Sequence, residues 1–118
     1  MIFIPRAAEA ADLYDLAGER WTVPVLSSLR EGTLRFGQIR RSLPGLSQKQ
    51  LTQTLRHLER DGFVQRTVYP TIPPRVDYQL TDLGSSLIVP LFEVGRFAVE
   101  RGGEIAEARR RFDEANSV

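Results

Sequence analysis

Through the first half of the chain, apolar residues recur every three or four positions, as they do on one face of an amphipathic helix. This spacing predicts four short helices, over residues 7–16, 19–30, 35–43 and 47–61. Pro24 lies in the first turn of the second helix, where a missing N–H costs least, and Gly32 is placed to cap its end. Pro44 and Gly45 force a turn before the fourth helix.

The fourth helix has the best-defined boundaries. Ser47 and Gln50 have the spacing of a capping box, and the segment ends before a glycine. Three leucines share one side of it: Leu51, Leu55 and Leu58. We therefore expect this side to pack into a core and the opposite side to face solvent.

The period of the pattern changes to two after residue 62. Residues 63–69 and 75–80 alternate as strands do, and the short proline-rich connector 70–74 joins them into a hairpin. Short helices and a turn, followed by a capped helix and a hairpin, form the plan of a winged helix-turn-helix. We expect a mainly α protein with a small β-hairpin.

A long helix is predicted next, over residues 82 to about 101, with Thr81 as its cap and a kink at Pro90. After a glycine pair, a final helix is predicted over 104–115. The long helix has two apolar stripes, although one suffices to cover its own domain. The second stripe predicts a homodimer, and the alternative is a helix buried deeply in a monomer. The residues predicted for the dimer interface are Leu83, Leu87, Ile88, Leu91 and Phe92.

Charged residues are distributed unevenly along the chain. Residues 20–75 hold ten basic and three acidic side chains, a net charge of +7, whereas the segments before and after each carry −3. A basic middle between acidic ends favours a polyanionic partner such as nucleic acid. A solvated face with salt bridges is the alternative.

The polar side of the fourth helix has the donors that read base edges. Opposite the leucines on a helical wheel lie Lys49, Gln53, Arg56 and Arg60, flanked by Thr52 and His57. Lysine and arginine donate to guanine, and glutamine pairs with adenine. Carboxylates come only at the C-terminal end of the helix. A surface helix that is merely solvated is the alternative.

The hairpin supplies a second basic site. Arg66 and Arg75 flank its stiff connector, which can reach a minor groove or a DNA backbone with little loss of entropy. An ordinary proline-rich turn is the alternative.

The composition excludes several classes of function. The sequence has no cysteine and a single histidine, His57, so it lacks disulfides, thiolate nucleophiles and the clustered ligands of a zinc site. It has no phosphate-binding glycine loop and no nucleophile elbow, so we expect no enzyme, no cofactor and no metal. No apolar run approaches about 18 residues, and residues 1–6 lack the pattern of a signal peptide. We therefore expect a cytoplasmic protein.

Two runs of residues carry a more specific signal. They are Leu43-Pro44-Gly45-Leu46-Ser47-Gln48-Lys49 and Val68-Tyr69-Pro70, the latter followed by Pro73-Pro74-Arg75-Val76. With these runs the chain resembles, over about residues 15–95, the HxlR-type family of bacterial winged helix-turn-helix transcriptional regulators. The resemblance implies a sequence-specific DNA-binding regulator that acts as a homodimer on an operator with two half-sites.

The resemblance also implies roles for particular residues. The fourth helix would read the DNA, with contacts from Ser47, Gln48, Lys49, Thr52, Gln53 and Arg56. The wing near Arg75 would contact the backbone or the minor groove, and we add Arg35 and Arg66 to the predicted DNA contacts. Residues 1–118 would form a single winged-helix domain, with a DNA-binding core at about 19–81 and N- and C-terminal dimerisation helices at about 6–17 and 82–116.

Several members of that family sense oxidants or electrophiles through an N-terminal cysteine. The absence of cysteine excludes that mechanism here. A small-molecule effector bound near the dimer interface, or no direct effector, remains. The alternative function is a winged-helix module that binds another protein without specific DNA binding.

Overall fold

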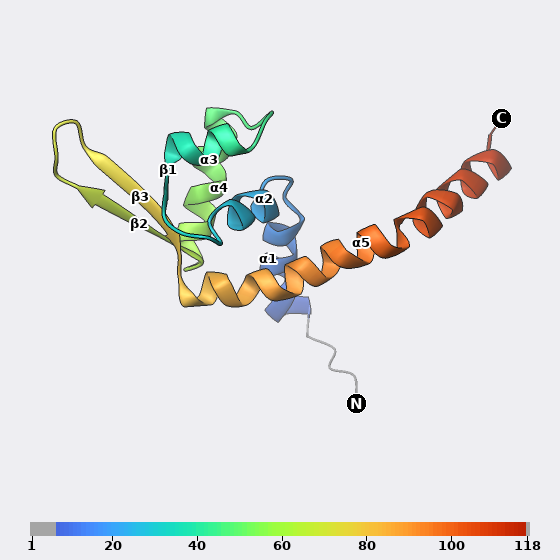
Figure 1. Cartoon of the computed structure of the whole chain (residues 1–118). Coiled ribbons are helices and arrows are strands. Elements are labelled where there is room, and N and C mark those ends of the chain that lie inside the picture. The colour runs from blue at the N-terminus through green and yellow to red at the C-terminus, as the bar shows by residue number, and fades with distance from the viewer. Residues whose placement is uncertain (1–6, 118) are drawn as a thin grey trace. The chain divides into compact units, whose positions relative to one another are not determined.

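The computed structural model describes residues 7–117 (Figure 1). Residues 1–6, in which no signal peptide is expected, and residue 118 lie outside the described part. The elements are, in order, α1 (Ala7–Gly18), α2 (Thr22–Ser28), β1 (Leu34–Arg35), α3 (Phe36–Ser42), α4 (Gln48–Arg60), β2 (Val64–Tyr69), β3 (Arg75–Leu80) and α5 (Asp82–Ala115). They belong to two compact units, one ending at Ile88 and the other beginning at Val89. The prediction of a mainly helical chain with a small antiparallel sheet is confirmed.

The core of the first unit contains side chains from α2, α3 and α4. Val25, Ile39, Leu51 and Leu58 are fully buried, and Leu55 is 2% exposed. Burying an aliphatic side chain of this size stabilises a fold by about 1.5–3 kcal/mol. The leucine side of α4 is therefore held against the other helices, as predicted.

The boundaries of α4 are also those predicted. Ser47 Oγ accepts a hydrogen bond from the Gln50 N–H at 3.1 Å, and Gln50 Oε1 accepts one from the Ser47 N–H at 3.0 Å, which completes the capping box. After the helix, Gly62 adopts a φ of +83°, a conformation that would strain a side chain. Thr54 is buried on α4 as well, although its polar side chain gives no such signal in the sequence.

The predicted hairpin is confirmed as β2 and β3, and a strand that the sequence did not predict completes the sheet. The two-residue strand β1 pairs with β3, so the strand order is β1-β3-β2, antiparallel throughout. Two residues are too few to show a period, which is why no pattern marks β1. Because β1 leads directly into α3, this pairing connects the start of α3 to the hairpin.

The second helix is shorter than predicted. α2 covers Thr22–Ser28 rather than 19–30, because the N–H groups of Leu29 and Arg30 are bonded three residues back, in turns. Gly32, with a φ of +147°, lies in the turn beyond the helix and not at its cap.

The prediction of two helices, over 82–101 and 104–115, is wrong. α5 runs unbroken through Pro90 and through the glycine pair. A glycine inside a helix costs about 1 kcal/mol relative to alanine, but Arg101 Nη2 donates to Glu104 Oε1 at 2.9 Å across the pair. Further arginine–glutamate pairs three and four residues apart follow, and such pairs support an exposed helix. Among the described helices, none has a stretch both long and apolar enough to span a bilayer.

The start of α5 packs closely against the chain that precedes β2. Thr81 Oγ1 accepts a hydrogen bond from the Gly84 N–H at 3.0 Å, which confirms Thr81 as the cap, and it donates to the carbonyl of Gly62. Gly84 is buried, and a Cβ added there would overlap the carbonyl oxygen of Phe63. Glycine is therefore required for this approach.

Candidate nucleic-acid interface

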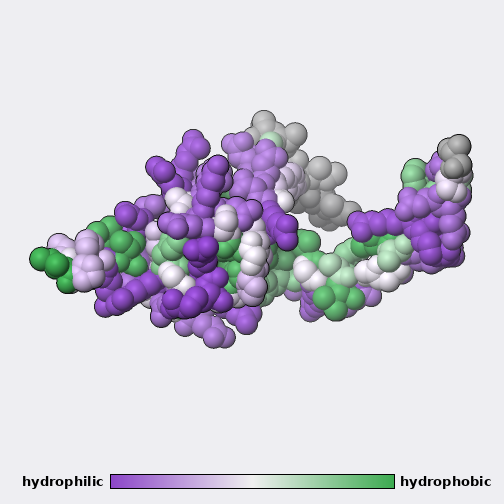
Figure 2. All heavy atoms as spheres, turned by 90° about the horizontal axis from the view of Figure 1, so that it is seen from above, coloured by the Kyte–Doolittle hydropathy of each residue, from purple (hydrophilic) through white to green (hydrophobic). Residues whose placement is uncertain are grey.

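The polar side of α4 faces solvent. Its exposed residues include all six side chains predicted to contact DNA: Ser47, Gln48, Lys49, Thr52, Gln53 and Arg56. The three leucines on the opposite side are buried, so the helix cannot rotate without exposing them. In the view of Figure 2, hydrophilic side chains cover much of the first unit, and apolar atoms lie at the end of the hairpin, whose connector contains the fully exposed Ile72.

The donors on this strip of α4 are open to a ligand. Thr52 Oγ1 donates to the Gln48 carbonyl at 2.8 Å, a bond within the helix. Among the side chains of residues 10–117, no hydrogen bond or ion pair engages Lys49, Gln53 or Arg56. Because nothing in the described chain holds these three side chains, they can turn toward a base edge or a phosphate.

The three arginines predicted outside α4 lie on opposite faces of the sheet. In the register, Arg66 pairs with Tyr78, whereas Arg35 and Thr67 both pair with the preceding residue of β3, Asp77. Successive side chains of a strand point to opposite faces. Arg66 and Tyr78 therefore share one face, and Arg35, Asp77 and Arg75 share the other.

Arg66 faces α4 across a groove of about 410 Å³, which we call the inner groove. Its lining includes Thr52 and Arg56 of α4 together with Arg66 and Tyr78 of the sheet, and one acidic residue, Glu59. The inner groove therefore places Arg66 of the hairpin beside the exposed polar side of α4.

Arg35 and Arg75 line a different groove, of about 700 Å³, on the other face of the sheet. We call it the outer groove, and its charged and aromatic lining consists of Arg35, Arg41, Tyr69, Arg75 and Asp77, with Gln38 beside them. Arg41 is not among the predicted contacts, because its only signal in the sequence is the neighbouring basic residue Arg40 near the end of α3.

Arg75 is held by its own strand. Its Nε and Nη2 donate to the two carboxylate oxygens of Asp77 at 3.0 and 2.9 Å, and its guanidinium carbon lies 5.2 Å from the centre of the Tyr69 ring. The hydrogen bond from Arg75, helped by the charges of Arg75 and Arg35, lowers the pKa of Asp77 against the opposing effect of burial. The same pair raises the pKa of Arg75. A DNA contact by Arg75 would thus come from a fixed guanidinium that stays half-exposed.

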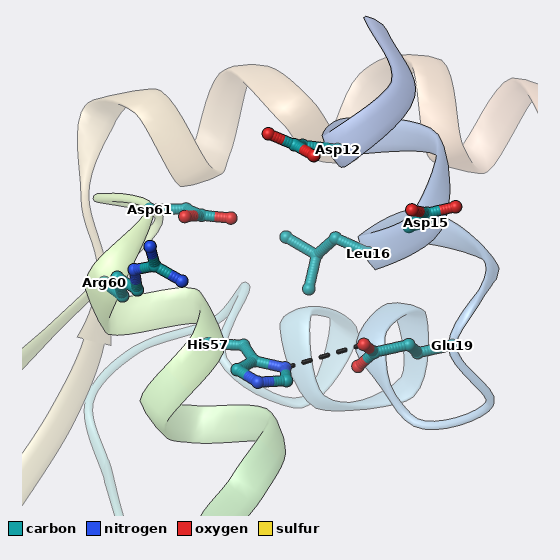
Figure 3. A pocket seen from close by; sticks show the side chains of 7 residues that line it. All are labelled: Asp12, Asp15, Leu16, Glu19, His57, Arg60 and Asp61. Carbon is teal, nitrogen blue, oxygen red and sulfur yellow. Dashed lines mark ion pairs between the residues drawn. The ribbon is translucent and has the colours of Figure 1, made fainter.

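His57, which the wheel placed beside the reading strip, turns toward α1 instead. Its Nδ1 lies 3.5 Å from Glu19 Oε1 (Figure 3). Together they line a pocket of about 330 Å³ between α1 and the end of α4, along with Asp12, Asp15, Leu16, Arg60 and Asp61. Arg60 therefore lies among carboxylates, a poor place to meet a phosphate. Within the described residues, no set of histidine and carboxylate side chains is arranged to hold a metal ion.

The residues predicted for a dimer interface differ in exposure. Leu83 is 55% exposed and Phe92 37%, Leu87 and Leu91 are half-buried, and Ile88 is buried in its own unit. In the second unit the apolar residues of α5 continue on the surface as Val94, Phe97, Val99, Ile105 and Phe112.

Comparison with known proteins identifies the family. A family model described as HxlR-like helix-turn-helix matches residues 16–105. The chain belongs to this family. The resemblance seen in the sequence is thereby confirmed.

Several relatives of this HxlR-like chain are named as transcriptional regulators. YtfH of Escherichia coli (strain K12), an uncharacterized HTH-type transcriptional regulator, is 52% identical over 68 residues, which cover 58% of this chain and 54% of YtfH. The chain thus spans about half the length of YtfH. YdeP of Bacillus subtilis (strain 168), also an uncharacterized HTH-type transcriptional regulator, is 36% identical over 102 residues, 84% of this chain and 80% of YdeP.

Solved structures of regulators share the fold of this HxlR-like chain. The reduced form of the transcriptional regulator YodB from B. subtilis has a TM-score of 0.70 at 32% identity and covers 82% of this chain and 92% of YodB. The reduced form of the redox regulator HypR has a TM-score of 0.76 at 30% identity and covers 84% of this chain and 98% of HypR. The predicted winged helix-turn-helix fold is confirmed.

Proposed function

We propose that this HxlR-like chain is a sequence-specific DNA-binding transcriptional regulator. The observation that carries the proposal is the exposed strip of Lys49, Gln53 and Arg56 on α4, in which no carboxylate interrupts the donors. An α-helix fits the major groove of B-DNA, and these side-chain types match the base edges exposed there. The names of the relatives support the same function.

In this proposal the wing makes the sequence-independent contacts. Arg66 lies across the inner groove from Arg56, so it can bind the backbone that passes between α4 and the hairpin. Contacts of this kind position a protein on the duplex but carry no base information. The regulator would act in the cytoplasm, where its DNA is.

The regulator would act as a homodimer. Support comes from the exposed apolar residues of α5 in the second unit, among them Val94 and Phe97, because exposed apolar surface of this kind marks an interaction site. A two-fold dimer binds two half-sites whose centres lie about 34 Å apart, or a multiple of that distance. The sequence has no cysteine, so the regulator would respond to a small-molecule effector bound near the dimer interface or would have no direct effector.

Selection of bound duplexes from a random pool tests this proposal. We expect the full chain to enrich an inverted repeat with the half-site spacing given above. Binding of the enriched duplex should weaken with salt, by a log–log slope of about −0.9 for each phosphate contacted. A pool that stays random, together with no salt-dependent binding of any duplex, would refute the function.

A further inference from the structure

The outer groove lies on the face of the sheet turned away from α4 and is strongly basic. Three arginines line it, Arg35, Arg41 and Arg75, and Asp77 is the one carboxylate among the described residues of its lining. The net charge of this lining is therefore +2. Clefts lined by one sign of charge raise the local concentration of ions of the opposite sign.

Asp77 neutralises only one of the three arginines that line the outer groove, Arg75. Both of its oxygens accept hydrogen bonds from Arg75, and its side chain is 9% exposed. Its carboxylate is thus committed to Arg75, and the other two guanidinium groups of the groove, those of Arg35 and Arg41, have no hydrogen-bonded carboxylate among the side chains of residues 10–117. Along α5, by contrast, Arg101, Arg110 and Arg111 are each paired with a glutamate on an adjacent turn.

A glycine in α3 leaves room for the guanidinium group of Arg41. Gly37 lies one turn before Arg41, and a Cβ added to Gly37 would sit 3.3 Å from Arg41 Nη1. The guanidinium therefore lies close over the first turn of α3, at the edge of the outer groove. Gln38 Oε1 accepts a hydrogen bond from the Arg35 N–H at 2.8 Å, which fixes the Gln38 amide on the same edge and leaves its NH₂ group as a further donor.

We propose that the outer groove binds a phosphate group, with Arg35 and Arg41 as its cationic donors and the Arg75–Asp77 pair as its wall. Guanidinium groups suit the planar, bidentate contacts that a phosphate accepts. The phosphate belongs either to a DNA backbone that crosses the outer face of the wing, which rests on the proposed function, or to a free phosphorylated compound, which does not. Both sources present the same chemistry to the groove.

The first arm of the test uses inorganic phosphate and the full chain. At constant ionic strength, titration with phosphate should shift the arginine Nε–Hε NMR signals of Arg35 and Arg41 in a saturable way. Arg41→Gln should weaken this binding about tenfold or more, because it removes a hydrogen-bonding charged donor. Arg41→Lys, which keeps the charge, should retain most of it, and Arg109→Gln, which removes an exposed arginine of α5, should leave it unchanged.

The second arm identifies the source by measuring the salt dependence of binding to a random duplex. If the backbone occupies the groove, Arg41→Gln reduces the log–log slope by about 0.9. An unchanged slope, with phosphate binding still lost in Arg41→Gln, assigns the site to a free phosphorylated compound.

A phosphate titration that is unsaturable, or identical for wild type and Arg41→Gln, overturns the site. If the wild-type chain binds no duplex at all, the regulator function fails, while the titration with phosphate still decides the outer groove. Circular dichroism of each variant confirms that the helices are intact before either arm is interpreted.

Discussion

At the scale of single residues, the sequence and the structure agree best where a side chain's role depends on one helix. Lys49, Gln53 and Arg56 are exposed on α4 because the leucines that alternate with them are buried. Arg66 and Arg75 are different, since their faces depend on the register of β2 and β3. A shift of one residue would exchange the two faces.

Replacing Gln53 or Arg56 by alanine should reduce sequence discrimination. A bidentate base contact is worth about 1–3 kcal/mol against the wrong base, so the preference for the selected operator over a random duplex should fall by about tenfold to a hundredfold. Competition binding with both duplexes measures this ratio, and Arg109→Ala on α5 is the control. An unchanged ratio in both variants would remove α4 from base reading.

The Arg75–Asp77 pair predicts a pH dependence of stability. The pKa of Asp77 in the folded chain lies below its ordinary value of 3.8. The stabilisation from this pair is therefore complete above that value and is lost as the pH falls through the lower, folded value. Asp77→Asn should be less stable than wild type at pH 7, and the difference should shrink in acid. Urea unfolding from pH 7 down to pH 2 measures it, and a constant difference would contradict the assignment.

At the scale of elements, close backbone contacts constrain the glycines of α5 more than helix propensity does. α5 continues through two glycines that its sequence would place in a break, yet it depends on a third, Gly84, for its approach to Phe63. The sequence does not distinguish Gly84 from Gly102 and Gly103. In the structure, an added Cβ would overlap the Phe63 carbonyl at Gly84 but would meet no atom within 4 Å at Gly102 or Gly103.

Gly84→Ala should therefore destabilise the first unit, whereas Gly95→Ala should not. The added methyl at Gly84 overlaps the Phe63 carbonyl, and overpacking of this kind costs about 1–3 kcal/mol. Nothing lies within 4 Å of a Cβ at Gly95, so alanine there should add up to about 1 kcal/mol through helix propensity. Thermal unfolding of the two variants checks the prediction, which fails if both change the midpoint in the same direction.

At the scale of the whole molecule, the exposed apolar residues of α5 determine what the protein can assemble with. Val94 is 67% exposed and Phe97 54%, although neither belongs to the set first predicted for the interface. Ile88 of that set is buried within its own unit and has little surface left for a partner. The proposed interface therefore includes residues of α5 beyond the five that the sequence singled out within the predicted dimerisation segment 82–116.

Val94→Asp should shift the protein from dimer toward monomer. A charge placed in a desolvated apolar interface is unpaired and strongly unfavourable, whereas an exposed position on a monomeric helix tolerates it. Sedimentation velocity distinguishes the 13.4 kDa chain from twice that mass, and Ser86→Asp on the same helix serves as the control. A folded Val94→Asp protein that stays dimeric at low micromolar concentration would place the interface elsewhere.

The sequence by itself determined the elements whose interactions are local. The capping box of α4, its leucine spacing and the alternation in β2 and β3 all join residues within a few positions of one another. Only the tertiary structure decided the pairing of β1 with β3, the faces taken by Arg35, Arg66 and Arg75, and the contact of His57 with Glu19. These features join residues that are distant in the sequence. Their geometry follows from register and packing, which local periodicity does not encode.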